Sequence, residues 1–337
     1  MRIAIVTDAW RPQINGVANT IGYTAACLER MGSKVLVVSP DQFRTVPCPT
    51  YPQIPVALDV WTIGKHLEVF SPDAVHISTE GPLGLAARQW CLARSFPFTT
   101  AYMTRFPEYI SMRFRIPPEL LFVFFQWFHQ PSSGVMVSTE SLRTELAGKG
   151  FKNLKLWSRG VDTGFFRPEE KGGLFAKRPR FLYVGRVAVE KNIGAFLELD
   201  LPGTKIVTGD GPVLEELKSS YPDAVFTGAK KGTDLASIYA SSDVFVFPSL
   251  TDTFGIVMLE AAACGLPVAA FPVQGPRDVV LDGVTGVLDR DLRKACLEAL
   301  EIDRSMCRKH ALSCSWSAST GQFFDNLSSV CNESMAS

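Results

Sequence analysis

Residues 244–270 read VFVFPSLTDTFGIVMLEAAACGLPVAA. A β-branched and aromatic run ends at Pro248, an apolar stretch typical of a buried helix follows Gly255, and a second short apolar run begins at Pro267. A strand, a helix and a strand in this order predict a parallel sheet with crossover helices. The segment therefore indicates an α/β fold.

Two acidic residues stand in this segment. Asp252 lies in the loop before the helix, and Glu260 lies about two turns further along. Backbone N–H groups at a helix start suit phosphate or sugar hydroxyls, and a carboxylate accepts hydrogen bonds from two adjacent ribose hydroxyls. The alternative is that Asp252 caps a core helix and Glu260 is a solvated helix residue. Because Glu260 has apolar neighbours in a stretch almost without charge, we favour a ligand-binding site.

Composition bounds the class of protein. The chain has 337 residues, enough for two domains, and its 34 acidic and 34 basic residues give a formal net charge of zero, which argues against a nucleic-acid partner. The eight cysteines include no C-x-x-C pair, and the first segment reads as a strand rather than a signal peptide. We therefore expect the protein to lie in a reducing cytoplasm. The longest apolar run, Leu120 to Phe125, is too short to span a bilayer, so we expect a soluble or membrane-surface protein.

Two series of short β-branched runs alternate with helical patterns along the chain. The first series contains residues 3–7, 34–39, 74–77, 98–102 and 134–138, and the second contains residues 180–184, 205–208, 224–227, 244–248 and 267–270. Between them, residues 166–176 combine turn chemistry with charge and glycine, which predicts a linker. We therefore expect two doubly wound, Rossmann-like domains, residues 1–168 and 169–315, facing one another with the ligand in their cleft.

Two cations follow the first strand of the second domain. Arg186 and Lys191 stand at the two ends of a short loop, and ligands of open α/β sheets bind outside the carboxyl ends of strands, so the pair is placed to meet a diphosphate. Exposed loop cations without a ligand are the alternative. Gly209 follows the next strand, where glycine permits either close backbone approach or a tight turn.

A glycine also lies in the first strand-to-helix loop of the chain. Gly16 would let the backbone come against a bound diphosphate, although Asn15-Gly16 is explained equally well as a turn. The loop is not a G-x-G-x-x-G sequence, which counts against a nicotinamide or flavin dinucleotide.

Taken in order, these motifs resemble the retaining nucleotide-sugar glycosyltransferases of family 4, which have the two-Rossmann-domain GT-B fold. The resemblance spans nearly the whole chain and rests on PQINGV at 12–17, TRFPEY at 104–109, RGVD at 159–162, the cations at 186 and 191, and TDTFGIVMLE at 251–260. Within the family, the chain looks most like the group of sulfoquinovosyl-diacylglycerol synthases, bacterial α-mannosyltransferases and glycosyl-diacylglycerol synthases, which mainly glycosylates lipids.

The resemblance implies a role for each motif. Arg186 and Lys191 would stabilise the diphosphate leaving group, Gly16 would face that diphosphate, and Glu260 would hold the ribose. The rest of the donor-binding set would be Gly209, Asp252, Thr253, Phe254, Gly255 and Ile256. Two cations at the diphosphate replace a metal ion, so we predict transfer without metal or cofactor. A terminal helix, residues 316–337, would cross back to the first domain.

One position departs from the family pattern. Met103 stands where the family usually has a histidine beside the donor sugar, and methionine has no ionisable proton and accepts hydrogen bonds only weakly. The chain is then either a transferase with altered rate or donor choice or a donor-binding protein with little activity.

Residues 105–130 combine arginines with aromatic side chains. The residues that suggest contact with lipid phosphates or a membrane interface are Arg105, Arg113, Arg115 and Trp127. A buried amphipathic helix of the first domain explains the aromatic residues equally well. The family resemblance favours the lipid interpretation.

The expected function is transfer of a sugar from a UDP-sugar to a lipid such as diacylglycerol, at the cytoplasmic face of a membrane whose surface is anionic. The alternatives are a GDP-mannose-dependent α-mannosyltransferase, an inactive sugar-nucleotide sensor, and a GT-B relative such as a non-hydrolysing epimerase or a phosphorylase.

Overall fold

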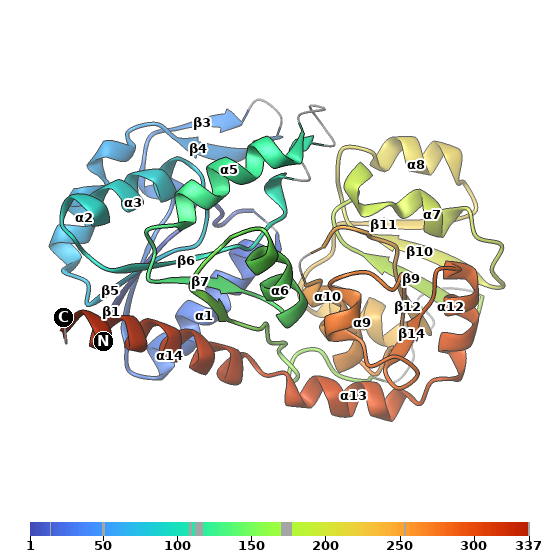
Figure 1. Cartoon of the computed structure of the whole chain (residues 1–337). Coiled ribbons are helices and arrows are strands. Elements are labelled where there is room, and N and C mark those ends of the chain that lie inside the picture. The colour runs from blue at the N-terminus through green and yellow to red at the C-terminus, as the bar shows by residue number, and fades with distance from the viewer. Residues whose placement is uncertain are drawn as a thin grey trace. The chain divides into compact units, whose positions relative to one another are not determined.

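The structure of the protein is a computed structural model, which describes residues 1–13, 15–48, 51–107, 110–111, 117–169, 177–252 and 254–335. The chain divides into two compact units, Met1–Ser158 with Trp316–Ser337, and Arg159–Ser315 (Figure 1). Each unit contains a parallel sheet whose strands alternate with helices along the chain. The predicted α/β class with two Rossmann-like domains is therefore confirmed.

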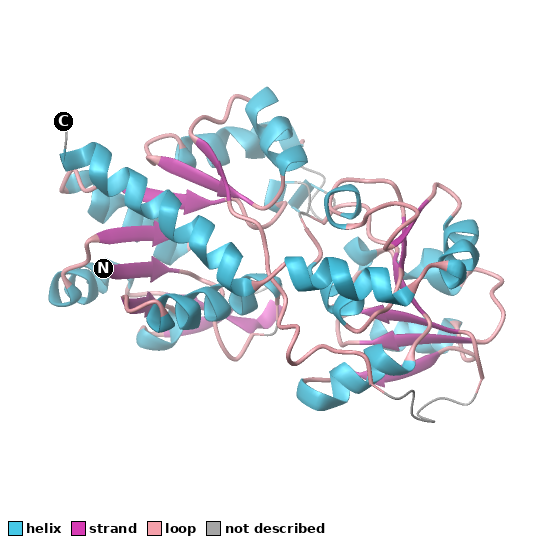
Figure 2. Ribbon diagram, turned by 90° about the horizontal axis from the view of Figure 1, so that it is seen from below, coloured by secondary structure: helices cyan, strands magenta, loops and turns pink. Residues whose placement is uncertain are grey.

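Unit 1 is built on a parallel sheet with the strand order β2-β1-β5-β6-β7-β8. Its strands are β1 (Arg2–Val6), β2 (Lys34–Val38), β5 (Ala74–Ile77), β6 (Phe98–Ala101), β7 (Gly134–Val137) and β8 (Leu154–Leu156), and an antiparallel hairpin adds β3 (Thr45–Cys48) and β4 (Tyr51–Ala57). Its helices are α1 (Gly16–Arg30), α2 (Ile63–Phe70), α3 (Pro82–Ala93), α5 (Pro118–His129), α6 (Glu140–Gly148) and α14 (Trp316–Met335), with short 3-10 turns at Pro40–Gln42 and Val60–Thr62. Figure 2 shows helices on both sides of the strands.

The sheet of unit 1 is buried on both faces because its side chains alternate between two apolar clusters. Ile3 and Ile5 of β1 belong to one cluster, whereas Ala4 and Val6 belong to the other. The first cluster also contains Phe323 of α14, so the C-terminal helix completes the core of this unit.

Several further contacts hold α14 in unit 1. Trp316 at its start stacks on Tyr23 of α1, with ring centroids 4.8 Å apart, and the Asn326 side chain donates to the Leu156 carbonyl at 2.9 Å. Figure 1 shows α14 running beside α1. Residues 316–335 therefore fold with the first unit, although they follow the second in sequence.

A half-buried acid, Asp8, joins the loop after β1 to α3. The Asp8 carboxylate accepts hydrogen bonds from the Leu83 N–H at 2.9 Å and the Thr79 hydroxyl at 2.7 Å, and so supplies the cap that the first turn of α3 needs. A Cβ on Gly81 would lie 2.5 Å from this carboxylate, so a side chain there would displace it. Burial raises the pKa of Asp8, and these hydrogen bonds lower it in part.

Unit 2 has the strand order β11-β10-β9-β12-β13-β14. Its strands are β9 (Arg180–Val184), β10 (Thr204–Thr208), β11 (Val225–Gly228), β12 (Val244–Phe247), β13 (Val268–Ala270) and β14 (Gly286–Leu288). Its helices are α7 (Ile193–Leu197), α8 (Leu214–Ser220), α9 (Gly232–Ser241), α10 (Ile256–Ala263), α11 (Pro276–Val279), α12 (Leu292–Glu298) and α13 (Arg304–Ser313), with 3-10 turns at Val189–Lys191 and Ala299–Glu301. This is the order of a dinucleotide-binding Rossmann sheet.

The boundary between the units falls after Ser158, ten residues before the predicted end of the first domain. Residues 159–168 have turn chemistry, but they pack on unit 2. Phe166 lies edge-on to Tyr239 with ring centroids 5.7 Å apart, and Arg308 of α13 donates to the carbonyls of Thr163 and Phe166. Apolar packing and a half-buried guanidinium thus attach residues 163–166, at the start of the predicted linker, to the second unit. Residues 170–176 of that linker lie outside the described residues.

Candidate active site

The candidate site of unit 2 begins where the order of its sheet reverses. Strands β9 and β12 are neighbours, and the chain leaves β9 towards β10 but leaves β12 towards β13. Ligands of open α/β sheets bind outside the carboxyl ends of strands at such a point. Residues 185–192 follow β9 and residues 248–255 follow β12, so both predicted donor-binding segments begin at the carboxyl ends of these two strands.

The structure joins these two segments directly. The Lys191 ammonium lies 2.5 Å from Oδ1 of Asp252, and the Asn192 side chain donates to the Pro248 carbonyl at 3.1 Å. The side chains of Lys191 and Asp252 are 20% and 16% exposed, so their charges are largely withdrawn from water. The sequence predicted separate contacts for these two residues, whereas the structure makes them partners of each other.

The loop after β12 also contains polar atoms that sequence reasoning did not single out. Ser249 is buried, and its hydroxyl, like Oδ2 of Asp252, has no hydrogen-bond partner in the part of the chain that the structure describes. A buried oxygen without a partner carries a desolvation cost that a ligand hydroxyl could relieve. The position of Ser249 directly after Pro248 is the signal that could have identified it.

The alternative role of Asp252 as a helix cap is wrong. Gly255 occupies the N-cap position of α10 with φ +81°, and no described side chain caps this helix. A Cβ on Gly255 would approach the Phe247 ring to 3.0 Å, so both conformation and packing require glycine. Phe254 and Ile256 flank it with their side chains half-buried, and Thr253 lies outside the described residues.

Glu260 is half-buried and hydrogen-bonded rather than exposed on a solvated helix face. The buried Tyr239 hydroxyl, on α9, donates to Oε2 of Glu260 at 2.9 Å. Burial raises the pKa of Glu260 to about 7, and the hydrogen bond from Tyr239 lowers it in part. Burial and the same carboxylate raise the pKa of Tyr239 well above its ordinary value. Sequence reasoning missed Tyr239 because no spacing rule links residues on α9 and α10.

Arg186 stands at the opposite end of the β9 loop from Lys191. Its side chain is 38% exposed and lies 3.8 Å from Glu190. Its carbonyl accepts a hydrogen bond from the Tyr183 hydroxyl at 2.9 Å, which fixes the start of the loop on β9. The guanidinium is thus accessible at the carboxyl edge of the sheet.

The structure explains why residue 209 is a glycine, which the sequence attributed to either close backbone approach or a tight turn. A Cβ at this position would lie 1.8 Å from the Gly185 carbonyl oxygen, and the backbone φ is +149°. Glycine is therefore required for the loops after β9 and β10 to approach each other. A contact of Gly209 with a donor stays a prediction.

Gly16 is the first residue of α1. Asn15 caps the helix by accepting from the Ala18 N–H at 2.9 Å, and Ile14 lies outside the described residues. An added Cβ at Gly16 would meet no atom within 4 Å among the described residues, so internal packing does not explain this glycine.

Met103 is buried in the same apolar cluster as Ile3 and Phe323, two residues beyond the end of β6. Arg105 lies nearby in sequence, and its guanidinium forms an ion pair with Glu145 of α6 at 2.6 Å. Its side chain is only 11% exposed, so its charge is largely offset within unit 1. A role for Arg105 with lipid phosphates stays a prediction, and Arg113 and Arg115 lie outside the described residues.

Helix α5 has one buried face and one exposed apolar face. Phe125 and Phe128 are buried, whereas a second apolar stripe is exposed at closely spaced positions along the helix: Leu120, Val123, Phe124 and Trp127. The Arg88 guanidinium lies over the Trp127 ring, 4.0 Å from its centroid. None of the helices in the described ranges combines the length and the hydrophobicity that a membrane-spanning segment needs.

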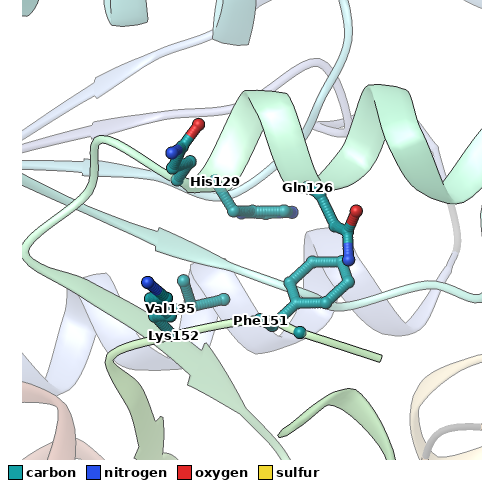
Figure 3. A pocket seen from close by; sticks show the side chains of 7 residues that line it. Gln126, His129, Val135, Phe151 and Lys152 are labelled. Atoms are coloured by element: carbon teal, nitrogen blue, oxygen red, sulfur yellow. The ribbon is translucent and has the colours of Figure 1, made fainter. Parts of the chain in front are cut away.

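A cavity of about 210 Å³ opens elsewhere in unit 1 (Figure 3). Its lining consists of Gln126, His129, Gln130, Val135, Gly150, Phe151 and Lys152. Val135 is near the start of β7 and residues 150–152 precede β8, so the cavity adjoins the amino ends of these strands. Within unit 1 it therefore lies at the opposite end of the sheet from Met103, which follows the carboxyl end of β6.

No cluster of three or more His, Cys, Asp or Glu residues that could hold a metal ion occurs in the described ranges. Metal independence remains a prediction.

The comparisons with known proteins give the family. A family model described as "Glycosyltransferase Family 4" matches residues 14–165, and one described as "Glycosyl transferases group 1" matches residues 178–301. The GDP-mannose-dependent alpha-mannosyltransferase of Mycobacterium tuberculosis is 31% identical over 316 residues, covering 86% of this chain and 83% of the relative. The sulfoquinovosyl transferase SQD2 of Arabidopsis thaliana is 30% identical, covering 82% and 61%. The alpha-monoglucosyldiacylglycerol synthase of Streptococcus pneumoniae is 27% identical, covering 93% and 81%.

Solved structures agree on the fold. Sucrose-phosphate synthase from Thermosynechococcus elongatus has a TM-score of 0.79 at 20% identity and covers 97% of this chain and 99% of its own. The Anabaena protein HepE, solved with UDP and glucose, has a TM-score of 0.73 at 16% identity and covers 98% and 100%. The chain belongs to the family 4 glycosyltransferases of the GT-B fold, and is an enzyme that transfers a glycosyl group from a nucleotide-sugar donor.

Proposed function

We propose that the protein is a retaining transferase that moves a sugar from a UDP-sugar to a lipid acceptor such as diacylglycerol, at the cytoplasmic face of an anionic membrane. The observation that carries the donor half is the arrangement at the β9/β12 switch point, where Arg186, Lys191, Asp252 and Glu260 lie in the loops after the two strands or in the helix that follows. Cations there suit a diphosphate, and carboxylates suit sugar and ribose hydroxyls.

The chemistry assigned to these residues is electrostatic. As the bond from the anomeric carbon to the diphosphate breaks, positive charge develops on the sugar ring and negative charge on the leaving group. Arg186 and Lys191 offset the growing negative charge, so neither a metal ion nor a cofactor is required. Asp252 orients the sugar through its hydroxyls, and Glu260 holds the ribose. Retention is proposed to proceed on one face of the sugar, with a donor phosphate oxygen assisting acceptor deprotonation and no protein nucleophile.

A lipid acceptor is supported by two independent observations. The S. pneumoniae relative is named for a diacylglycerol product. In addition, α5 exposes the apolar stripe Leu120, Val123, Phe124 and Trp127, which suits insertion at the boundary of lipid headgroups and acyl chains.

A GDP-mannose-dependent α-mannosyltransferase is the second candidate. It is favoured by the 31% identity to the M. tuberculosis enzyme of that name. The two candidates differ in the nucleotide base and in the sugar, so binding measurements separate them.

Donor identity is tested by thermal shift with UDP-glucose, UDP-galactose, GDP-mannose and GDP-glucose, because a ligand that binds only the folded state raises the melting temperature by mass action. Donor depletion is then followed with diacylglycerol in vesicles, with and without EDTA. Stabilisation by a UDP-sugar and EDTA-resistant transfer to lipid are expected. Stabilisation by GDP-mannose alone would replace the UDP proposal, and transfer abolished by EDTA would refute metal independence.

The membrane surface is tested by flotation with vesicles that contain or lack anionic lipid. Val123→Glu places a charge in the exposed stripe of α5 and should lower the bound fraction. Val69→Glu is the matched control, because Val69 is 86% exposed on α2 of the same unit. Equal flotation of the two variants would contradict the assignment of α5.

A further inference from the structure

We infer that the Lys191–Asp252 ion pair makes the site select a nucleotide sugar over the nucleoside diphosphate that remains after transfer. The inference rests on the proposed function, because it assigns the diphosphate to Lys191 and the donor sugar to Asp252. It adds a role for the pairing itself, which neither residue has alone.

The Asp252 carboxylate has the Lys191 ammonium as its ion-pair partner in the ligand-free protein. Their 2.5 Å contact joins the loop after β9 to the loop after β12, and both side chains are mostly withdrawn from solvent. A charge in such a place is stable only with a partner, and removal of one partner leaves the other uncompensated. A ligand that draws the Lys191 ammonium away from Asp252 must therefore also supply new hydrogen-bond donors to the Asp252 carboxylate.

The loop around Asp252 has hydrogen-bonding capacity that suits a sugar. Oδ2 of Asp252 and the hydroxyl of Ser249 are both buried, and neither has a partner within the described ranges. Ser249 is 1% exposed, so it contributes a polar atom that bulk water does not satisfy. Hydroxyl groups of a hexose can donate to the carboxylate and exchange hydrogen bonds with the serine.

The two ligands differ in what they offer to the site. A nucleotide sugar gives its diphosphate to Lys191 and its hydroxyls to Asp252, so both members of the ion pair gain new partners. A nucleoside diphosphate attracts Lys191 but presents phosphate oxygens to Asp252, and like charges at short range repel. After transfer, Lys191 returns to Asp252, which favours release of the diphosphate.

The experiment measures dissociation constants by calorimetry for UDP with UDP-glucose and for GDP with GDP-mannose, in the full chain. Asp252→Asn removes the repulsion and the competing partner, so the variant should bind the nucleoside diphosphate about tenfold more tightly than wild type. Lys191→Gln leaves Asp252 uncompensated. This substitution should weaken binding of the nucleoside diphosphate more than binding of the nucleotide sugar. The two variants should therefore change the ratio of the two dissociation constants in opposite directions.

Asp210→Asn is the control for overall charge, because Asp210 is an exposed carboxylate at the same edge of the sheet and should change the ratio by less than about threefold. Unchanged or weaker diphosphate binding in Asp252→Asn would overturn the inference, since a residue that merely contacts the sugar would affect the donor alone. If Asp252→Asn does not fold, the inference is overturned when Lys191→Gln weakens binding of the nucleoside diphosphate and of the nucleotide sugar equally. Failure of wild type to bind any nucleotide sugar would instead overturn the proposed function.

Discussion

Replacing Tyr239 with phenylalanine should move the pH dependence of donor binding towards alkaline pH. In the structure, the Tyr239 hydroxyl donates to Oε2 of Glu260 at 2.9 Å, and this hydrogen bond favours the ionised carboxylate. Burial opposes it and holds the pKa of Glu260 at about 7. A carboxylate that accepts hydrogen bonds from both ribose hydroxyls must be ionised, so donor binding should weaken as pH falls below 7.

The expected size follows from the energy of the lost hydrogen bond. A hydrogen bond to a charged group contributes about 1.5–3 kcal/mol, and one pKa unit corresponds to about 1.36 kcal/mol, so Tyr239→Phe should raise the midpoint by about one to two pH units. The midpoint of donor binding should then lie near pH 8 or above.

The same carboxylate also affects folding stability, with a sign that can be worked out. The pKa of Glu260 is about 7 in the folded protein against an ordinary value of 4.5, so the folded state holds more protons than the unfolded state between these values. Stability therefore falls as pH rises from 4.5 to 7, and the ionised carboxylate costs about 3 kcal/mol above pH 7. Glu260→Gln should accordingly be more stable than wild type at pH 8 and should bind the donor more weakly.

Calorimetric titration with the preferred nucleotide sugar from pH 6 to 9 checks the prediction. The control is Tyr221→Phe, which removes a hydroxyl that lies 3.2 Å from Glu198 on the exposed surface of the same unit. Wild type and the control should share a midpoint near pH 7. Superimposable profiles for wild type and Tyr239→Phe would refute the reasoning, because they would show that Glu260 does not titrate with donor binding.

Three further substitutions follow from local packing. Met103→His should raise transferase activity and cost about 1–3 kcal/mol of stability, because the imidazole enters an apolar cluster; turnover unchanged from wild type, with Met103→Leu as control, would refute the activity claim. Gly209→Ala should destabilise by about 3 kcal/mol or more in thermal melting, whereas Gly321→Ala on α14, where a Cβ meets no described atom, should be neutral or stabilising. Asp8→Ala should destabilise by about 1–3 kcal/mol in urea unfolding through loss of the α3 cap, and an unchanged midpoint would contradict that role.

The fold could be predicted where strands are buried on both faces. Strands such as β9 and β12 consist almost entirely of aliphatic and aromatic residues, and their observed limits differ from the predicted ones by a residue at most. The hairpin of β3 and β4 was missed because its strands contain prolines, which normally argue against a ladder. Strands β8 and β14 were missed because each is three residues long and lies at the edge of its sheet.

The candidate site was predictable in its residues but not in their partners. Charged residues in loops after strands are visible in the sequence, so Lys191 and Asp252 could be selected from their positions along the chain. Their pairing depends on β9 lying beside β12, which is a property of sheet order. The contact between Tyr239 and Glu260 depends in the same way on the packing of two helices.

Because Asp252 and Glu260 have different partners, their contributions to ligand binding depend on different variables. Asp252 faces a cation, so its contribution depends on whether the ligand replaces that cation. Glu260 faces a neutral phenol, so its contribution depends on proton release. A nucleoside diphosphate and a nucleotide sugar share the ribose, and above pH 7 the terminal phosphate of the diphosphate is already ionised. The pH dependence attributed to Glu260 should therefore be the same for both ligands in that range, while substitution of Asp252 should alter their ratio. If the ratio itself changed with pH in the Tyr239→Phe variant, the ribose and sugar ends of the site would be coupled, and the separate assignment of the two acids would be wrong.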